Sequence, residues 1–476
     1  MSQKIAKNTA YMTIASILQK VIAFLYFTLI ARYLGAGGTG KYFFALSFTT
    51  IFVIFVDMGF NNVLIRESAK LEEQMQNFFS TVLSAKMVFA VLTYIATVAA
   101  INLMGYPEET RHLVYLSGVT MLFDSFHQSN YGVLRAIGNL KWEAFGMVGS
   151  QLITLVLGTT FLFLGFPLIF LILAFTIPSI LNVIYSASVL FYKYEVKFLP
   201  RFNKHTFFKL GKIAIPFALA AIFSRIYSRA DTIILSKLAG DQAVGWYSIP
   251  KKISNAFRFL PMALIASVYP KFSEYYKDNK EKLAYLLERS LKYLMLLVFP
   301  ISVGIMLLSQ DIVITIYTEE FVRSILPLKV LMISLFFSFI SFPLGAFLNA
   351  CDRQKTQTAI VGIVMTVNVI LNLILIPKFS VLGAAISALV GNLLLAVLGY
   401  YFVPKITDIS HKFLISCGAK IGSAAALMGI IVWWINMFVH FLITIVVGAA
   451  VYFAVLYLFG IITKELVQEA RNLFKS

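Results

Sequence analysis

Positively charged side chains stand inside long apolar stretches of this sequence, where water cannot easily reach them. Arg225 and Arg229 are four residues apart and Lys251 and Arg258 are seven apart, so each pair would share one helix face. A charge at bilayer depth is unfavourable unless it faces protein or water, which makes each one a candidate functional site. Such cations suit an anionic head group, above all a phosphate, which Arg binds through two parallel hydrogen bonds. The predicted cationic site comprises Lys20, Arg225, Arg229, Lys251, Lys252 and Arg258.

A simpler explanation of these cations stays open at this stage. Asp231 is close enough along the chain to neutralise Arg225 or Arg229. Lys252 could instead extend its stem toward the outer interface. Lys86 lies nearer the end of its apolar run and is expected to reach the interface in the same way. The cations near the middle of their runs are too deep for this.

Acidic side chains at the same depth are few, and they are the candidates for coupling to an ion. Asp57 is the first candidate and Asp124 the second, followed by His127 and Asp231. Asp124 and His127 are three residues apart and could form a proton relay, because both groups can exchange protons when partly buried. A hydrogen bond to a serine of the same run is the open alternative. No cofactor is predicted beyond a coupling ion, H⁺ or Na⁺, or the membrane potential as driving force.

The composition explains why so many charges fall at this depth. Hydrophobic residues make up 59% of the 476 residues and charged residues only 13%, with a mean hydropathy of +0.84. A soluble domain carries about 25% charged residues. The sequence therefore predicts an all-α polytopic membrane protein with about fourteen spans. The apolar runs are 8–31, 41–65, 79–104, 112–134, 144–165, 167–191, 212–238, 245–269, 284–308, 325–349, 356–377, 381–402, 413–435 and 438–461.

The net charge of +18 does not indicate nucleic acid, because the basic residues lie between apolar runs rather than in tails or patches. They concentrate in every second loop, which is the positive-inside pattern. This bias predicts a multi-pass membrane protein with both termini and the 192–212 linker in the cytoplasm. The protein is expected to act as a monomer in the cell membrane. Two cysteines, Cys351 and Cys417, provide neither a disulfide framework nor a metal site.

An internal repeat divides the chain into similar halves. Several matches share one offset of 205 residues, and they pair Arg32 with Lys237, Gly35 with Gly240, Gly40 with Gly245, Tyr42 with Tyr247 and Lys20 with Arg225. A second set of matches, Leu134 with Leu348 and Lys141 with Lys355, has an offset of 214. The repeat predicts an N-lobe at 1–200, a C-lobe at 201–405 and an added helix pair at 406–476. Two repeats around a central cavity are typical of transporters.

The stretch from Gly35 to Lys41 resembles two nucleotide-binding motifs but lacks their context. It fits G-x-G-x-x-G and nearly fits a P-loop, yet Tyr42 stands where the P-loop needs Ser or Thr. Both motifs follow a β-strand, whereas a membrane helix precedes this stretch. We therefore predict an external turn over 35–41 between the first two helices.

Several short motifs together resemble the polysaccharide-transporter (Wzx-like) flippases of the multidrug/oligosaccharidyl-lipid/polysaccharide superfamily. They are Arg32-Tyr-Leu-Gly35, Gly40-Lys-Tyr42, Asp57-Met-Gly59, Ile65-Arg66-Glu67 and Asp231 followed by Gly245-Trp-Tyr247. The resemblance covers essentially the whole chain, and the order of the motifs carries it. It implies two lobes that alternate access, with a cargo of undecaprenyl- or dolichyl-phosphate-linked oligosaccharide moved from the cytoplasmic to the outer leaflet.

Three alternatives stand beside this interpretation, and the sequence separates the first of them only weakly. A peptidoglycan-precursor flippase would share the fourteen helices and the cationic site. A multidrug efflux antiporter would usually have twelve helices and a more acidic cavity. A membrane glycosyltransferase or polymerase would need acidic metal-binding motifs or a large outer loop, and the sequence contains neither, so no enzyme is predicted.

Overall fold

The computed structural model describes residues 2–461, and every regular element in that range is helical. This confirms the predicted all-α fold. The first helices are α1 (Ser2–Asp57), α2 (Phe60–Lys70), α3 (Met75–Leu103), α4 (Glu108–Ile137), α5 (Lys141–Phe163), α6 (Ile169–Tyr194) and α7 (Lys204–Ala256). They are followed by α8 (Phe259–Asp278), α9 (Lys280–Leu307), α10 (Ser309–Ile316), α11 (Ile325–Ala350), α12 (Gln354–Phe379), α13 (Val381–Phe402), α14 (His411–Ile435) and α15 (Phe441–Leu458).

Eleven helical stretches within the described range are long and apolar enough to cross a membrane. Two of them, Lys7–Asp57 and Lys204–Asp278, are each long enough for two spans and bend sharply at a glycine. The more polar α4 has the length of a span and packs along α6. Counted in this way, the helices confirm the predicted fourteen spans.

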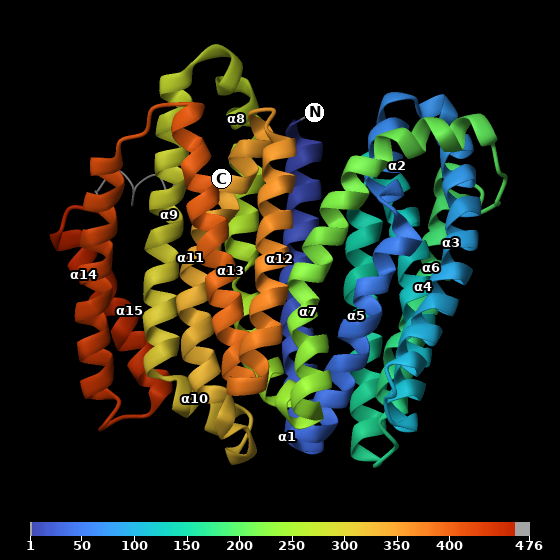
Figure 1. The fold of residues 1–476 in the computed structure, drawn as a ribbon. Coiled ribbons are helices and arrows are strands. Elements are labelled where there is room, and N and C mark those ends of the chain that lie inside the picture. The colour runs from blue at the N-terminus through green and yellow to red at the C-terminus, as the bar shows by residue number, and fades with distance from the viewer. Residues whose placement is uncertain (1, 462–476) are drawn as a thin grey trace. The chain divides into compact units, whose positions relative to one another are not determined.

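The helices form two compact units, Met1–Gly245 and Trp246–Ser476. In the first unit α4 packs against α6 and α1 against α5, and Figure 1 shows α4 and α6 side by side. The first turns of α7 belong to this unit, since Leu210 and Ala214 are buried in the same apolar cluster as Phe60. In the second unit α11 packs against α13, and α14 lies on α9. The repeat-based boundaries at residues 200 and 405 stay a prediction.

Gly35 and Gly240 interrupt α1 and α7 with the same backbone conformation. Their angles are φ 62°, ψ −170° and φ 82°, ψ 178°, a region that is essentially restricted to glycine. The prediction of a turn over 35–41 was wrong in its extent, because helical residues resume directly after Gly35. A single glycine is enough to kink each helix, because glycine can adopt backbone angles that a side chain would prevent.

A second break splits the spans that follow these two glycines. Asp57 ends α1, and Met58 and Gly59 adopt positive φ values of 45° and 78° before α2 begins. Gly59 lies directly against α7, because a Cβ there would come within 2.8 Å of the Ala214 carbonyl oxygen. In the second half the corresponding break lies at residues 257–258, between α7 and α8.

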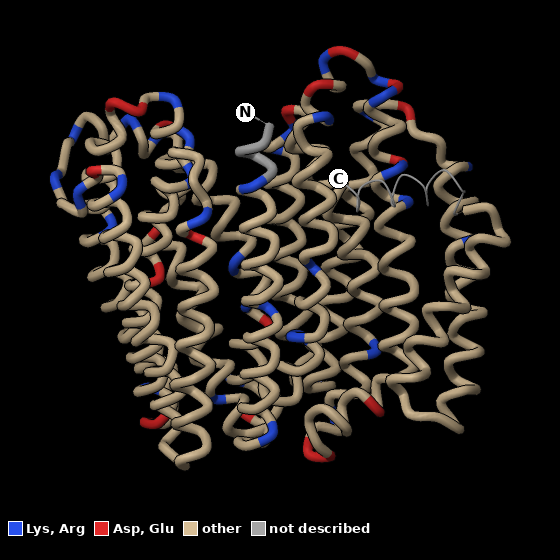
Figure 2. Tube along the Cα trace, turned by 180° about the vertical axis from the view of Figure 1, so that it is seen from behind, with Lys and Arg blue, Asp and Glu red and all other residues tan. Residues whose placement is uncertain are grey.

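Within each unit, Lys and Arg crowd around the loops at one end of the helices, and a few lie midway along them, as Figure 2 shows. The C-terminal segment 462–476, expected to be cytoplasmic, lies outside the described residues.

Candidate functional site

The first unit brings two predicted cations of α7 against the second half of α1. Arg229 donates a hydrogen bond to Ser47 Oγ at 3.3 Å, and Asp57 acts electrostatically on Arg225. The Arg225 side chain is exposed rather than packed.

Asp231 is buried and is engaged with its own neighbour. Its Oδ1 atom accepts hydrogen bonds from the backbone nitrogen of Thr232 at 2.7 Å and from the Thr232 hydroxyl at 3.2 Å. Lys20, the repeat equivalent of Arg225, lies on the exposed face of α1. The roles proposed for these residues stay predictions.

The expectation that Lys86 reaches the interface was wrong. Its side chain is 0% exposed, and its ammonium group lies 2.7 Å from Asp57 Oδ1. Further oxygens surround it, from Asn61 on α2 at 2.9 Å and from Ser125 and Ser129 on α4 at 2.7 to 3.3 Å. The reason is the start of α3 at Met75, which places Lys86 deeper in its helix than the apolar run from 79 suggested.

Asp124 and His127 lie together as the spacing predicted. The His127 ring nitrogen Nε2 lies 3.1 Å from Asp124 Oδ1, and the Ser179 hydroxyl of α6 donates to the same oxygen at 2.6 Å. The serine partner therefore comes from a neighbouring helix, while the two serines of the same run hold Lys86 instead. An acid, a histidine and a hydroxyl in contact can hold or pass on a proton.

The second unit presents its predicted cations around the start of α8. The Lys251 ammonium lies 5.4 Å from the centre of the Tyr247 ring, and Lys252 is partly buried beside it. Arg258 stands at the N-terminus of α8, where its buried Nε atom has no hydrogen-bond partner within the described part of the chain. A buried donor of this kind suits an acceptor that arrives with a ligand.

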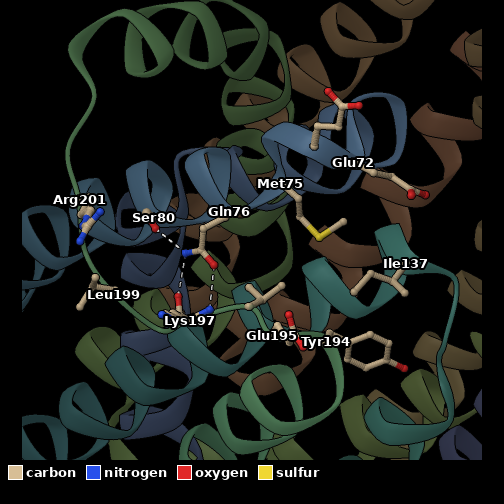
Figure 3. A pocket seen from close by; sticks show the side chains of 12 residues that line it. Glu72, Met75, Gln76, Ser80, Ile137, Tyr194, Glu195, Lys197, Leu199 and Arg201 are labelled. Atoms are coloured by element: carbon tan, nitrogen blue, oxygen red, sulfur yellow. Dashed lines mark hydrogen bonds between the residues drawn. The ribbon is translucent and has the colours of Figure 1, made fainter.

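A cavity of about 630 Å³ lies elsewhere in the first unit, where α3, α4 and α6 meet the segment after Tyr194. Figure 3 shows Gln76 at its wall, accepting from the Lys197 backbone nitrogen at 2.8 Å and donating to the Lys197 carbonyl oxygen at 3.0 Å. Three carboxylates, Glu72, Glu73 and Glu195, line the cavity beside Lys197 and Arg201. Because this lining is mixed in charge and holds none of the deep cations, we do not assign an anionic cargo to it.

Sequence comparisons relate this chain to membrane proteins of polysaccharide assembly. The family model described as "Polysaccharide biosynthesis protein" matches residues 5–276, and the one named MatE matches residues 216–374. The capsular polysaccharide biosynthesis protein CapF of Staphylococcus aureus is 22% identical over 84% of this chain and 99% of its own. The probable low-salt glycan biosynthesis flippase Agl15 of Haloferax volcanii is 21% identical over 86% of this chain and 85% of its own.

Among solved structures, the lipid II flippase MurJ in an inward closed conformation has the same fold. It superposes with a TM-score of 0.78 over 94% of this chain and 98% of its own, at 19% sequence identity. A match at this level of identity establishes that the two proteins share a fold.

Proposed function

The chain belongs to the polysaccharide biosynthesis protein family of membrane transporters, and we propose that it flips an oligosaccharide linked to polyprenyl phosphate or pyrophosphate from the cytoplasmic to the outer leaflet. The product serves the assembly of a cell-surface polysaccharide or glycan. Transport proceeds by alternating access of an N-lobe (1–200) and a C-lobe (201–405), with the helix pair 406–476 added to them. The protein acts as a monomer in the cell membrane.

The observation that carries this proposal is the set of cations with unmet or exposed hydrogen-bonding groups. The Arg225 side chain is exposed, and the buried Arg258 Nε has no acceptor among the described residues. A phosphate oxygen would satisfy such donors and offset their desolvation. In the proposal, Lys20, Arg225 and Arg258 hold the phosphate, Arg229 supports it, and Lys251 and Lys252 help it toward the outer leaflet.

A peptidoglycan lipid precursor is the second candidate cargo, and the structural likeness to a lipid II flippase favours it. Its head group is also a phosphate, so the deep cations serve both cargoes equally. A multidrug antiporter, suggested by the partial MatE match, is opposed by the same cations, which would repel a cationic drug.

Reconstituted vesicles separate the three cargoes. We expect purified protein to move a fluorescent polyprenyl-pyrophosphate oligosaccharide across the bilayer faster than lipid II, and not to accumulate a cationic dye. Faster movement of lipid II would reverse the assignment, and dye accumulation with neither lipid moving would reject a flippase. Depletion of the protein in cells should cause its lipid-linked sugar to accumulate. Chemical analysis of that sugar would identify the glycan.

The orientation is part of the proposal, with both termini and the 192–212 linker in the cytoplasm. Impermeant maleimide added to intact cells should label Cys introduced at the exposed Glu108 and should not label Cys introduced at the exposed Lys204. The native thiols should stay silent, since Cys351 and Cys417 are buried and burial raises the pKa of the Cys351 thiol to about 12. The opposite pattern of labelling would invert the topology.

The driving force is proposed to be H⁺, Na⁺ or the membrane potential, with Asp57, Asp124, His127 and Asp231 as the candidate coupling groups. Asp124 carries the strongest case on geometry, because His127 and Ser179 both contact the same carboxylate oxygen.

A further inference from the structure

The ammonium group of Lys86 occupies a cage of oxygen atoms supplied by three helices. Asp57 Oδ1 at the end of α1 lies 2.7 Å away, and Asn61 Oδ1 of α2 lies 2.9 Å away. From α4, Ser129 Oγ lies at 2.7 Å, and the carbonyl and hydroxyl oxygens of Ser125 lie at 3.2 Å and 3.3 Å. The ammonium group is enclosed, because the Lys86 side chain is 0% exposed, while the Asp57 side chain is 20% exposed.

This set of ligands has the chemistry of a site for a monovalent cation. It contains five oxygen atoms, of which only one, from Asp57, belongs to a charged group. An ammonium group has three hydrogens, so five oxygens exceed what its hydrogen bonds require. The cage also lies at the C-terminus of α1, where Met58 and Gly59 separate α1 from α2. Carbonyl oxygens and the helix dipole at such an end favour positive charge.

We propose that Lys86 is a tethered cation that fills a monovalent-cation site of the first unit, and that removal of its ammonium group opens this site to Na⁺ or K⁺. One carboxylate, that of Asp57, balances one positive charge, which suits a monovalent rather than a divalent cation. A covalently held cation has the advantage that it loses no translational freedom on binding.

This inference narrows the choice of coupling group and goes beyond the identity of the cargo. While Lys86 fills the cage, Asp57 Oδ1 already contacts a cation and does not offer that oxygen to Na⁺. Any sodium dependence of transport would then arise at another acid, such as Asp124 or Asp231. The inference depends only on the contacts of Lys86, so it can fail while the proposed flippase function stands, and the reverse is also true.

Thermal unfolding of the purified full-length protein in NaCl, KCl or choline chloride at equal ionic strength tests the proposal. We expect Lys86→Ala to unfold at a lower temperature than the unchanged protein in choline. In NaCl or KCl its midpoint should rise by about 3 °C, because a cation that binds only the folded state stabilises it. The unchanged protein should show the same midpoint in all three salts. A Lys86→Ala midpoint that is equally insensitive to the salt would overturn the proposal.

Lys292 provides a matched control, because it is also a buried lysine of a long helix. It is 6% exposed, and the one hydrogen bond found for it, at 3.3 Å, goes to the Ile461 carbonyl oxygen. Lys292→Ala should lose stability without any response to Na⁺ or K⁺. A response equal to that of Lys86→Ala would mean that the salts act on the fold in general and not on the cage.

A second set of variants keeps the test decisive if Lys86→Ala does not fold. Asp57→Asn should lower the unfolding midpoint, since it leaves a buried ammonium without a counter-charge. The double change Lys86→Met with Asp57→Asn removes both charges and should recover most of the loss. Full stability of Asp57→Asn alone would show that the carboxylate does not hold the ammonium, and would contradict the proposal.

Discussion

The segment around Gly35 and its counterpart 205 residues later have the same backbone, yet the spans that follow them differ. Gly40 lies against the Asp241 carbonyl and Gly245 against the Ala36 carbonyl, so closely that a Cβ on either glycine would overlap that backbone. The contacts are reciprocal, because Ala36 and Asp241 are themselves separated by the same offset. The two turns thus pack on each other as equivalent elements.

The equivalence ends about twenty residues further along each half. The first helix ends at Asp57, whose ion pair with Lys86 closes the cage. In the second half, Ala256 ends the helix and Met262 stands at the offset of 205, so neither alignment places an acid there. The turn and the deep cation, Lys20 or Arg225, recur in both halves, whereas the caged ion pair belongs to the first alone. The two halves therefore share the turn and one deep cation each, and they differ in their acidic residues.

The largest effect on flipping is expected at the deep cation that occurs in both halves, Lys20 in the first and Arg225 in the second. Arg225→Ala should reduce the rate of flipping in vesicles by roughly 10- to 100-fold, the scale of lost hydrogen bonds to a charged group. Its unfolding midpoint should not change, because the side chain is exposed. Arg225→Lys should keep part of the activity, since the charge stays while the bidentate geometry is lost. Lys20→Ala should reduce flipping in the same direction.

Two results would break this part of the comparison. Full flipping by Lys20→Ala would show that the repeat equivalence does not extend to the cargo site. Full flipping by the double change Arg225→Ala with Asp231→Asn would show that Arg225 balances an acid and does not bind cargo.

An intermediate effect is expected at the reciprocal glycines. Gly40→Ala and Gly245→Ala should each reduce the free energy of unfolding by about 1–3 kcal/mol, because the added methyl group overlaps backbone that cannot rotate away. The two losses should be similar if the contacts are truly equivalent. Gly211→Ala is the control, since a Cβ there meets no atom within 4 Å and alanine favours the helix. If only one of the two substitutions reduces the free energy of unfolding, the two glycine contacts are not equivalent.

The span count and the repeat were predictable because hydropathy and glycine spacing act locally along the chain. A positive φ at Gly35 and Gly240 is a property of one residue and its neighbours, so equal spacing was enough to relate them. The extent of the 35–41 turn was not predictable from composition, since small residues fit a loop or a tight helix contact equally well. Only the approach of the Asp241 backbone distinguishes the two.

The site was harder to predict because its partners come from other helices. Lys86 resembled an interfacial lysine in the sequence, and its partners Asn61, Ser125 and Ser129 are 25 to 43 residues away. Arg229 likewise donates a hydrogen bond to Ser47, which lies 182 residues away in the sequence. Charge at depth identifies a group that needs a partner, but the packing decides which partner it has.

The smallest effect is expected at Asp124, a second acid of the first half without a counterpart, since Ser338 stands at the offset of 214. Ser179→Ala removes the 2.6 Å hydrogen bond to Asp124 and should reduce the free energy of unfolding by only about 1 kcal/mol. If Asp124 is the coupling group, flipping by Ser179→Ala should also depend less on an imposed ion gradient, because the hydroxyl that holds the Asp124 carboxylate is lost. Ser84→Ala is the control, since Ser84 bonds only the Ser80 carbonyl of its own helix and should shift neither quantity. An unchanged dependence on the imposed gradient in both Ser179→Ala and Asp124→Asn would remove Asp124 from the coupling groups. The caged lysine would then be the remaining difference between the two halves.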